Sequence, residues 1–248
     1  MDAYELMIKT NHHLIRDGVL TDAQKATIAR KLREGKITDG RRRTFDAYAY
    51  PRFYIPPHNN GKKLQTIIPI SPKTNIVADN AYEYEIIRLL HQFAPDAETA
   101  HMIAETKARL KRTCFGYQSC HYAECFEAGL MVLRFLSFAA LDERDWIAKQ
   151  ITMYNNHFKD RKHHNGVQKF YWLILSELPQ DIAQTEVKRQ ENAIIDHLNR
   201  SYLIKNGTED VALYAMRNAL MRLPAYAYLN KRAPFTDEKT GRLRFALS

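Results

Sequence analysis

Apolar residues recur at helical spacing along most of this chain, with one long interruption. The first such stretch covers residues 4–15. A second begins at Thr21-Asp-Ala-Gln24, whose spacing predicts a capping box, and ends near Gly35. Beyond Asn80 the spacing predicts helices near 81–93, 96–112, 119–141, 143–158, 166–178, 181–204 and 209–222, then an extended tail at 226–248. The N-caps expected among these helices are Asp96, Ser119, Asp142 and Thr208.

The interruption covers residues 36–79, where five prolines exclude long helices. Residues 52–55 and 64–70 are short runs with β propensity, and Asn59-Asn60-Gly61 between them suits a turn. We therefore expect an irregular, proline-rich connection with room for a small β-hairpin.

The predicted fold class is all-α, with helix pairs in layers. Similar residue patterns recur at the helix junctions with offsets of 46, 39 and 45 residues. That is the scale of HEAT or armadillo repeats, which pair helices about every 40–47 residues. An irregular helical bundle is the alternative. We expect a single domain over residues 1–248, made of an N-terminal helix pair (1–35), the connection (36–79), a helical array (80–225) and the tail (226–248).

The positive charge of the chain is concentrated in one segment, residues 36–73. The chain has 248 residues, 45% hydrophobic and 26% charged, which is typical of a globular protein, and a net charge of +9. Of that excess, +6 lies in residues 36–73 and only +2 in residues 74–248. Glycine is scarce, with nine residues, and neither GxGxxG nor GxxxxGK[ST] occurs, which argues against the common nucleotide-binding loops.

The sequence favours a cytoplasmic location without a membrane partner. Residues 130–141 are the most apolar run, but they are too short for a membrane span of about 20 residues and include Arg134. The N-terminal residues do not show the pattern of a secretory signal. Three cysteines, Cys114, Cys120 and Cys125, are an odd and clustered set, which favours a reducing compartment over a disulfide framework.

A basic, aromatic segment within residues 40–63 is one candidate site. Arginine binds phosphate in a bidentate manner and aromatic rings stack on bases, so this composition is typical of single-stranded nucleic-acid contacts. An acidic protein surface is an alternative partner. The other interpretation is that the rings pack on the helical body while the arginines are solvated or paired. The candidate anion-binding residues are Arg41, Arg42, Arg43, Arg52, Lys62, Lys63, Tyr48, Tyr50 and Phe53.

Residues 114–127 hold the second candidate site. If Ser119 caps a helix, Cys120 lies in its first turn, where the helix dipole favours a thiolate. Cys120, His121 and Glu124 are then candidate catalytic residues, although a catalytic base would have to come from another helix. Cys114, His121 and Cys125 are candidate metal ligands, but no second CxxC or HxxxH completes a zinc motif. The structural interpretation is that the cysteines are buried apolar residues.

Three function hypotheses remain. The first is a helical protein that binds an anionic partner through residues 40–63. The second is an enzyme or metal-dependent protein that uses residues 114–127. The third is a scaffold for protein partners without chemistry of its own. The sequence implies no particular cofactor and leaves the oligomeric state open.

Overall fold

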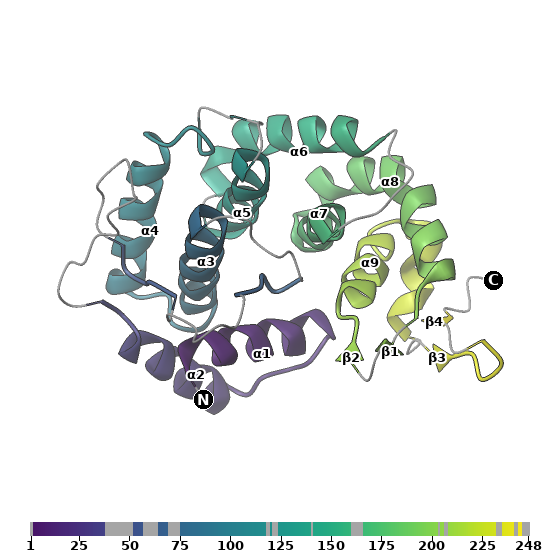
Figure 1. The fold of residues 1–248 in the computed structure, drawn as a ribbon, viewed down its shortest axis with the longest axis horizontal. Coiled ribbons are helices and arrows are strands. Elements are labelled where there is room, and N and C mark those ends of the chain that lie inside the picture. Colours follow the sequence, from purple (N-terminus) through teal and green to yellow (C-terminus); the bar gives the residue numbers. More distant parts are fainter. Residues whose placement is uncertain are drawn as a thin grey trace. The chain divides into compact units, whose positions relative to one another are not determined.

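The structure is a computed structural model, and it describes residues 2–37, 52–56, 64–68, 75–117, 120, 124–139, 141–159, 166–202, 204–205, 208–231, 235–240 and 243–244. These residues confirm the all-α prediction (Figure 1). The elements are α1 (Ala3–Ile15), α2 (Asp22–Glu34), α3 (Asn75–Phe93), α4 (Ala97–Leu110), α5 (Glu124–Ala139), η1 (Leu141–Glu143), α6 (Arg144–Lys159), α7 (Gly166–Glu177), α8 (Gln180–Arg200), β1 (Ile204–Lys205), β2 (Thr208–Glu209), α9 (Ala212–Leu220), η2 (Pro224–Lys231), β3 (Phe235–Thr236) and β4 (Leu243–Arg244).

Local capping chemistry explains two helix starts as predicted. Thr21 and Gln24 form the capping box of α2, and the Asp96 side chain accepts a hydrogen bond from the Thr99 amide at the start of α4. Asp142 and Thr208 are corrections, because they lie in η1 and β2 instead of capping helices. The tail also differs from the prediction, since η2 and the antiparallel pair β3–β4 form there.

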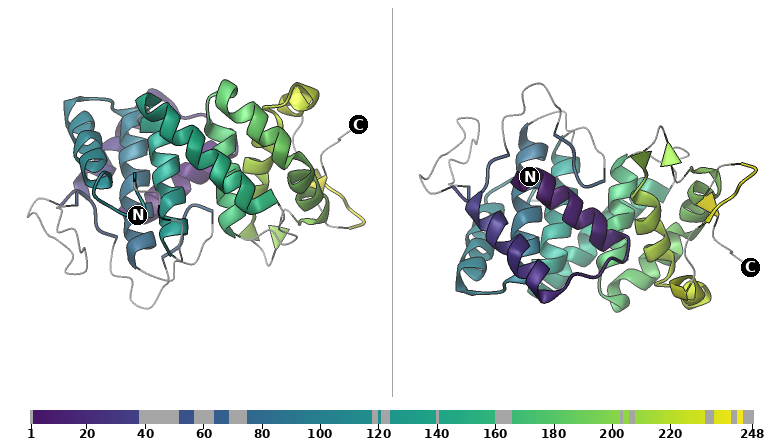
Figure 2. Two further views of the ribbon diagram at one scale, coloured as in Figure 1. Left: turned by 90° about the horizontal axis from the view of Figure 1, so that it is seen from above. Right: turned by 90° about the horizontal axis from the view of Figure 1, so that it is seen from below.

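The chain divides into two compact units, Met1–Trp146 and Ile147–Ser248. In the first unit α3 is the central helix, and α1, α2, α4 and α5 each contact it (Figure 2). Several of its apolar residues are fully buried: Val77, Ile86, Ile87, Leu89 and Leu90. Because it is covered on several sides, this helix also buries charged residues, which are described below.

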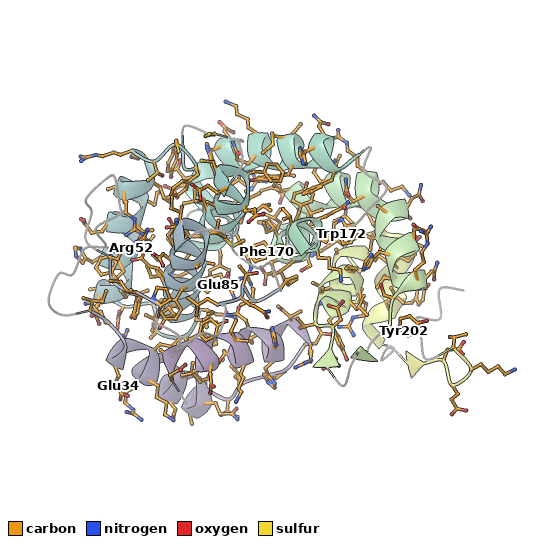
Figure 3. The ribbon with its side chains drawn as sticks, viewed as in Figure 1. Glu34, Arg52, Glu85, Phe170, Trp172 and Tyr202 are labelled. Atoms are coloured by element: carbon orange, nitrogen blue, oxygen red, sulfur yellow. The ribbon has the colours of Figure 1, made fainter. Side chains whose placement is uncertain are left out.

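In the second unit α7 contacts α8 and α9, and its residues Phe170 and Trp172 are fully buried (Figure 3). Buried amide groups add specific hydrogen bonds to this packing. The Trp172 indole N–H donates to Gln190 Oε1 at 3.2 Å, and the Asn155 amide donates to Glu186 Oε2 at 2.6 Å. Each buried polar group named here is therefore paired within the unit.

Three predictions about the architecture stay predictions. The described parts of the two β-compatible runs, residues 52–56 and 64–68, contain no strand, and the turn at 59–61 lies outside the described residues, so the hairpin is not confirmed. The repeat pattern and the single domain are likewise untested. Among the helices that the structure describes, none combines the length and apolar character needed to cross a membrane.

Candidate metal centre

The site begins with a tight turn at the end of α4. The Tyr117 amide donates to the Leu110 carbonyl at 3.3 Å, and the Gly116 amide donates to the Thr113 carbonyl at 3.1 Å. A Cβ on Gly116 would lie 2.3 Å from the Leu110 carbonyl oxygen and 2.6 Å from Thr113 Oγ1. Only glycine therefore permits this close approach of the turn to the end of the helix.

Two aromatic residues hold this turn in place. Phe115 is buried, and the Tyr117 ring lies 5.6 Å from the Trp146 ring between centroids. Burial and the nearby Glu143 carboxylate raise the pKa of the Tyr117 hydroxyl, so that residue stays neutral. Cys114 is thus carried on a backbone segment whose neighbours on both sides are packed.

The backbone then returns to bring a second cysteine beside the first. The Cys120 amide donates to the Cys114 carbonyl at 2.7 Å, which closes the loop between them. Helix α5 starts at Glu124, so Cys125 lies in its first turn. A loop and a helix start together therefore supply three thiols.

Cys114, Cys120 and Cys125 form what we call the cysteine cluster. Their three sulfur atoms all lie within 4.8 Å of one another, and the Sγ atoms of Cys114 and Cys125 are 3.5 Å apart. All three residues are half-buried, and none is in a disulfide. Zinc–sulfur bonds of about 2.3 Å at tetrahedral angles place sulfur atoms ~3.8 Å apart. The cluster therefore has the dimensions of three ligands around a single ion.

The electrostatics of the cluster do not favour a nucleophile. Burial and the neighbouring thiols of Cys114 and Cys120 raise the pKa of Cys125 to about 12. A nucleophilic cysteine needs its thiolate form near neutral pH, which requires a lowered pKa. Crowded thiols instead suit a bound cation, because the cation stabilises all three thiolates together.

Glu124, which directly precedes Cys125 in the sequence, has an enclosed carboxylate oxygen. It is half-buried, and its Oε2 atom is enclosed by protein without a hydrogen-bond partner. The indole nitrogen of Trp146, which packs against Tyr117, is enclosed and unpaired in the same way. Enclosed polar atoms of this kind also occur elsewhere in the described chain, for example at Tyr54 and Thr106, so they do not by themselves mark a ligand site.

The structure changes the predicted roles in this segment. Cys114 and Cys125 do converge, as expected of metal ligands, but Cys120 joins them as a third sulfur instead of acting from a helix start. Residues 121–123, between Cys120 and the first described residue of α5, lie outside the described residues, so the predicted effect of the helix start on the Cys120 thiol stays a prediction. His121 and Ser119 lie outside the described residues. The sequence signal for Cys120 as a ligand was its clustering alone.

The basic, aromatic segment is corrected where the structure describes it. Arg52 is buried, and its Nη1 donates to Glu83 Oε2 at 2.9 Å and to Asn80 Oδ1 at 3.0 Å. The Phe53 amide donates to Glu83 Oε1 at 2.8 Å, and its ring meets the His101 ring edge-on at 6.1 Å. Both residues therefore attach the connection to the helical body instead of facing a partner. The other candidates lie outside the described residues: Arg41, Arg42, Arg43, Tyr48, Tyr50, Lys62 and Lys63.

Arg52 meets five other charged residues inside the first unit, and the sequence analysis proposed no site for those five. We call these six residues the α3 ion cluster: Glu83, Glu85, Arg52, Arg88, Arg109 and Arg134, all buried. Glu83 pairs with Arg52 and Arg109, and Glu85 pairs with Arg134 and with Arg88 Nε at 3.0 Å; Figure 3 marks Arg52 and Glu85. Burial acts to raise the pKa of Glu83, but the guanidiniums of Arg109 and Arg52 outweigh it and leave that pKa lowered.

Comparison of the chain with protein-family models, with curated proteins and with solved structures finds no match in any of the three. Any function must therefore be argued from the site itself.

Proposed function

We propose that this protein binds a single thiophilic metal ion, zinc foremost, through Cys114, Cys120 and Cys125. The observation that carries the proposal is the approach of all three sulfur atoms to within 4.8 Å of one another. Soft thiolate ligands favour Zn²⁺, Cu⁺ and iron–sulfur clusters over hard cations. A single ion fits better than a cluster of several irons, in which each thiolate binds a different iron and the sulfur atoms lie further apart.

Packing alone gives a weaker account of the same arrangement. Cysteines that serve only as small apolar residues are usually fully buried, and their sulfur atoms need not converge. Here all three are half-buried and belong to two different backbone elements. A disulfide is also a weaker account, because the Sγ atoms of Cys114 and Cys125 are 3.5 Å apart, against about 2.05 Å for a bond, and one thiol would be left over.

The bound ion would cross-link the chain segment that connects α4 to α5. It would join Cys114 in the turn after α4, Cys120 at the end of the loop and Cys125 in the first turn of α5. Closing such a loop through an ion stabilises the folded state, since the ligands do not converge in the unfolded chain. We therefore assign the ion a structural role in the first unit and propose no reaction for it.

The direct experiment is metal analysis of protein purified under reducing conditions and supplied with zinc. We expect about one equivalent of zinc per chain, and we expect the three thiols to react slowly with a thiol reagent until a chelator is added. Cys114→Ser, Cys120→Ser and Cys125→Ser variants should each retain less metal, while Ser137→Ala on α5 should retain as much as the unaltered protein. No bound metal, with thiol labelling that zinc does not slow, would overturn the proposal.

A reducing, cytoplasmic compartment is part of this proposal. Thiolate metal sites persist where free thiols stay reduced, whereas an oxidising compartment favours disulfides. Three unpaired cysteines within reach of one another support this location. Measuring the oxidation state of the thiols in freshly lysed cells, with rapid alkylation, tests it.

Binding of nucleic acid or of an acidic protein surface stays a prediction. Its remaining support is the charge of +6 in residues 36–73. Arg52 contributes to that charge, although it is paired inside the fold. Retention on single-stranded nucleic acid across a salt series tests the prediction, because electrostatic binding must weaken as salt rises.

A further inference from the structure

We propose that hydrogen peroxide oxidises the cysteine cluster to a disulfide between Cys114 and Cys125, and that this oxidation expels the bound ion. The disulfide depends on the cysteines alone, whereas the release of the ion rests on the proposed function. The same two segments would thus be cross-linked by a metal ion under reducing conditions and by a disulfide after exposure to an oxidant. Disulfides in reducing compartments are usually transient and serve catalysis or redox sensing.

The contact between two sulfur atoms carries the proposal. The Sγ atoms of Cys114 and Cys125 are 3.5 Å apart, so an approach of about 1.5 Å brings them to the disulfide bond length of about 2.05 Å. Cys114 lies in the turn after α4, and Cys125 lies in the first turn of α5. Side chains from two separate backbone elements are therefore already within reach of bond formation in the reduced protein.

The state of the three cysteines also suits oxidation. None of them is in a disulfide, and all three are half-buried, so a small oxidant such as hydrogen peroxide reaches them from solvent. The bound ion holds the sulfur atoms as thiolates, and the thiolate is the form that peroxide oxidises. A neighbouring thiolate then captures the oxidised sulfur before further oxygen is added, which keeps the reaction reversible.

The oxidation is a two-electron reaction in two steps. One thiolate of the pair attacks an oxygen atom of hydrogen peroxide; the O–O bond breaks, hydroxide leaves and a sulfenic acid forms. The other thiolate attacks the sulfenic sulfur; the S–S bond forms and a second hydroxide leaves. Two protons from solvent convert both hydroxides to water. The two sulfur atoms are oxidised, the peroxide is reduced, and the zinc stays Zn²⁺ throughout.

The loss of two thiolates releases the ion. Cysteine binds metal as a thiolate, and Cys120 is the single cluster thiolate left once the disulfide has formed. One thiolate does not hold zinc, whose structural sites have four ligands. The disulfide joins residues that are 11 apart in sequence, so the turn after α4 stays attached to the start of α5. A dithiol reductant restores the three thiols, and with them the metal site.

Treatment of zinc-loaded protein with a small excess of hydrogen peroxide tests the proposal. A chromogenic chelator follows zinc release, a thiol reagent counts the free thiols, and mass spectrometry locates the disulfide. Trypsin leaves all three cysteines in one peptide, residues 113–134, so chymotrypsin must then cut at the aromatic residues between them, Phe115, Tyr117 and Tyr122.

Three results are expected together. About one equivalent of zinc is released, the three free thiols fall to one, and the disulfide joins the peptides of Cys114 and Cys125. Dithiothreitol with added zinc should restore the starting state. The matched variants are Cys120→Ser, which keeps the contacting pair, and Cys125→Ser, which removes it. Cys120→Ser should form its disulfide faster than Cys125→Ser; equal rates would show that the 3.5 Å contact does not select the pair.

The other outcomes separate the two proposals. Three thiols that stay free, a disulfide to Cys120 in the unaltered protein, or a sulfinic acid that dithiothreitol does not reverse would each overturn the oxidation. A disulfide that forms without loss of zinc would overturn the release step. Protein that binds no zinc at the outset overturns the proposed function. The disulfide is then sought in metal-free protein in mildly alkaline buffer, because the pKa of Cys125, raised to about 12, leaves little thiolate at neutral pH.

Discussion

The α3 ion cluster and the cysteine cluster both lie in the first unit. They differ in the hydrogen-bond partners that the chain provides for their carboxylates and thiols. In the α3 ion cluster, Glu83 is fully enclosed and three groups of the chain donate hydrogen bonds to it. In the cysteine cluster, the three sulfur atoms lie within 4.8 Å of one another. Glu124, the residue before Cys125 in the sequence, has an enclosed Oε2 atom without a hydrogen-bond partner. Glu83 thus has its hydrogen-bond donors within the chain, whereas Glu124 Oε2 has none among the described residues.

This difference concerns how the hydrogen-bonding needs of enclosed carboxylates are met in the first unit. Burial by itself does not discriminate, because the α3 ion cluster is the more buried of the two. The difference lies in the donors that reach each carboxylate: Glu83 accepts three hydrogen bonds, and Glu124 Oε2 accepts none among the described residues. The four predictions below test each side of the comparison, starting with the largest expected effect.

Removing the carboxylate of Glu83 should destabilise the protein most. The Glu83→Ala variant leaves Arg52 and Arg109 buried without their shared carboxylate, and such uncompensated charges cost about 3–5 kcal/mol. Urea unfolding followed by circular dichroism measures the loss. The matched substitution Glu105→Ala, at an exposed position, should leave the unfolding midpoint unchanged. A loss below about 1 kcal/mol would contradict the structural role of the cluster.

Zinc should stabilise the metal-free protein through the cysteine cluster. At a free zinc concentration 100 times Kd, the expected gain is about 2.7 kcal/mol in the free energy of unfolding. Thermal unfolding with and without zinc measures it. Mg²⁺, which prefers oxygen ligands, is the control cation and should give no shift. A variant with all three cysteines replaced by serine should lose the response; an equal response in that variant would place the zinc elsewhere.

Substitution of Gly116 should damage the turn that carries Cys114. In Gly116→Ala the added methyl group would overlap the Leu110 carbonyl oxygen, so we expect a loss of about 1–3 kcal/mol and weaker zinc binding. Gly35→Ala is the control with the smaller overlap, because its nearest neighbour would be the Ala3 Cβ at 3.2 Å, against 2.3 Å to the Leu110 carbonyl oxygen at Gly116. Urea unfolding and zinc titration check both variants. Equal behaviour of the two would show that the turn does not need glycine.

Acid should reveal the ionised state of Glu83. Because the pKa of Glu83 is lowered in the folded protein, its stabilising contribution is present above the unfolded value, about 4.3, and is lost as the pH falls through the folded value. The Glu83→Gln variant lacks this group, so its stability should fall less steeply below about pH 4 than that of the unaltered protein. Urea midpoints measured from pH 6 downward provide the comparison. Identical slopes would mean that Glu83 does not stay ionised in the fold.

Much of the fold could be predicted from the sequence, because helical spacing and caps are local properties. The capping box at Thr21 and the N-cap at Asp96 are examples, as both depend on residues within one turn. Asp142 and Thr208 show the limit: each suits an N-cap, yet the chain around them forms other structure. A side chain that can cap does not by itself decide where a helix begins.

The sites were less predictable, because they depend on residues distant in sequence. Arg52 was a candidate anion-binding residue, because no local sequence pattern shows that it pairs with Glu83, which lies 31 residues later. The clustering of the cysteines did indicate a candidate site. A helix capped by Ser119, however, would have placed Cys120 in its first turn and away from Cys114. The structure instead brings Cys120 back along the loop to Cys114, which a periodic pattern cannot express.

X-ray absorption at the zinc edge counts the sulfur atoms bound to the ion, so it tests whether Cys114, Cys120 and Cys125 bind the zinc. For zinc-loaded protein we expect three sulfur atoms at about 2.3 Å from the ion. A first shell made only of nitrogen and oxygen atoms would contradict it, since the zinc would then be bound away from Cys114, Cys120 and Cys125.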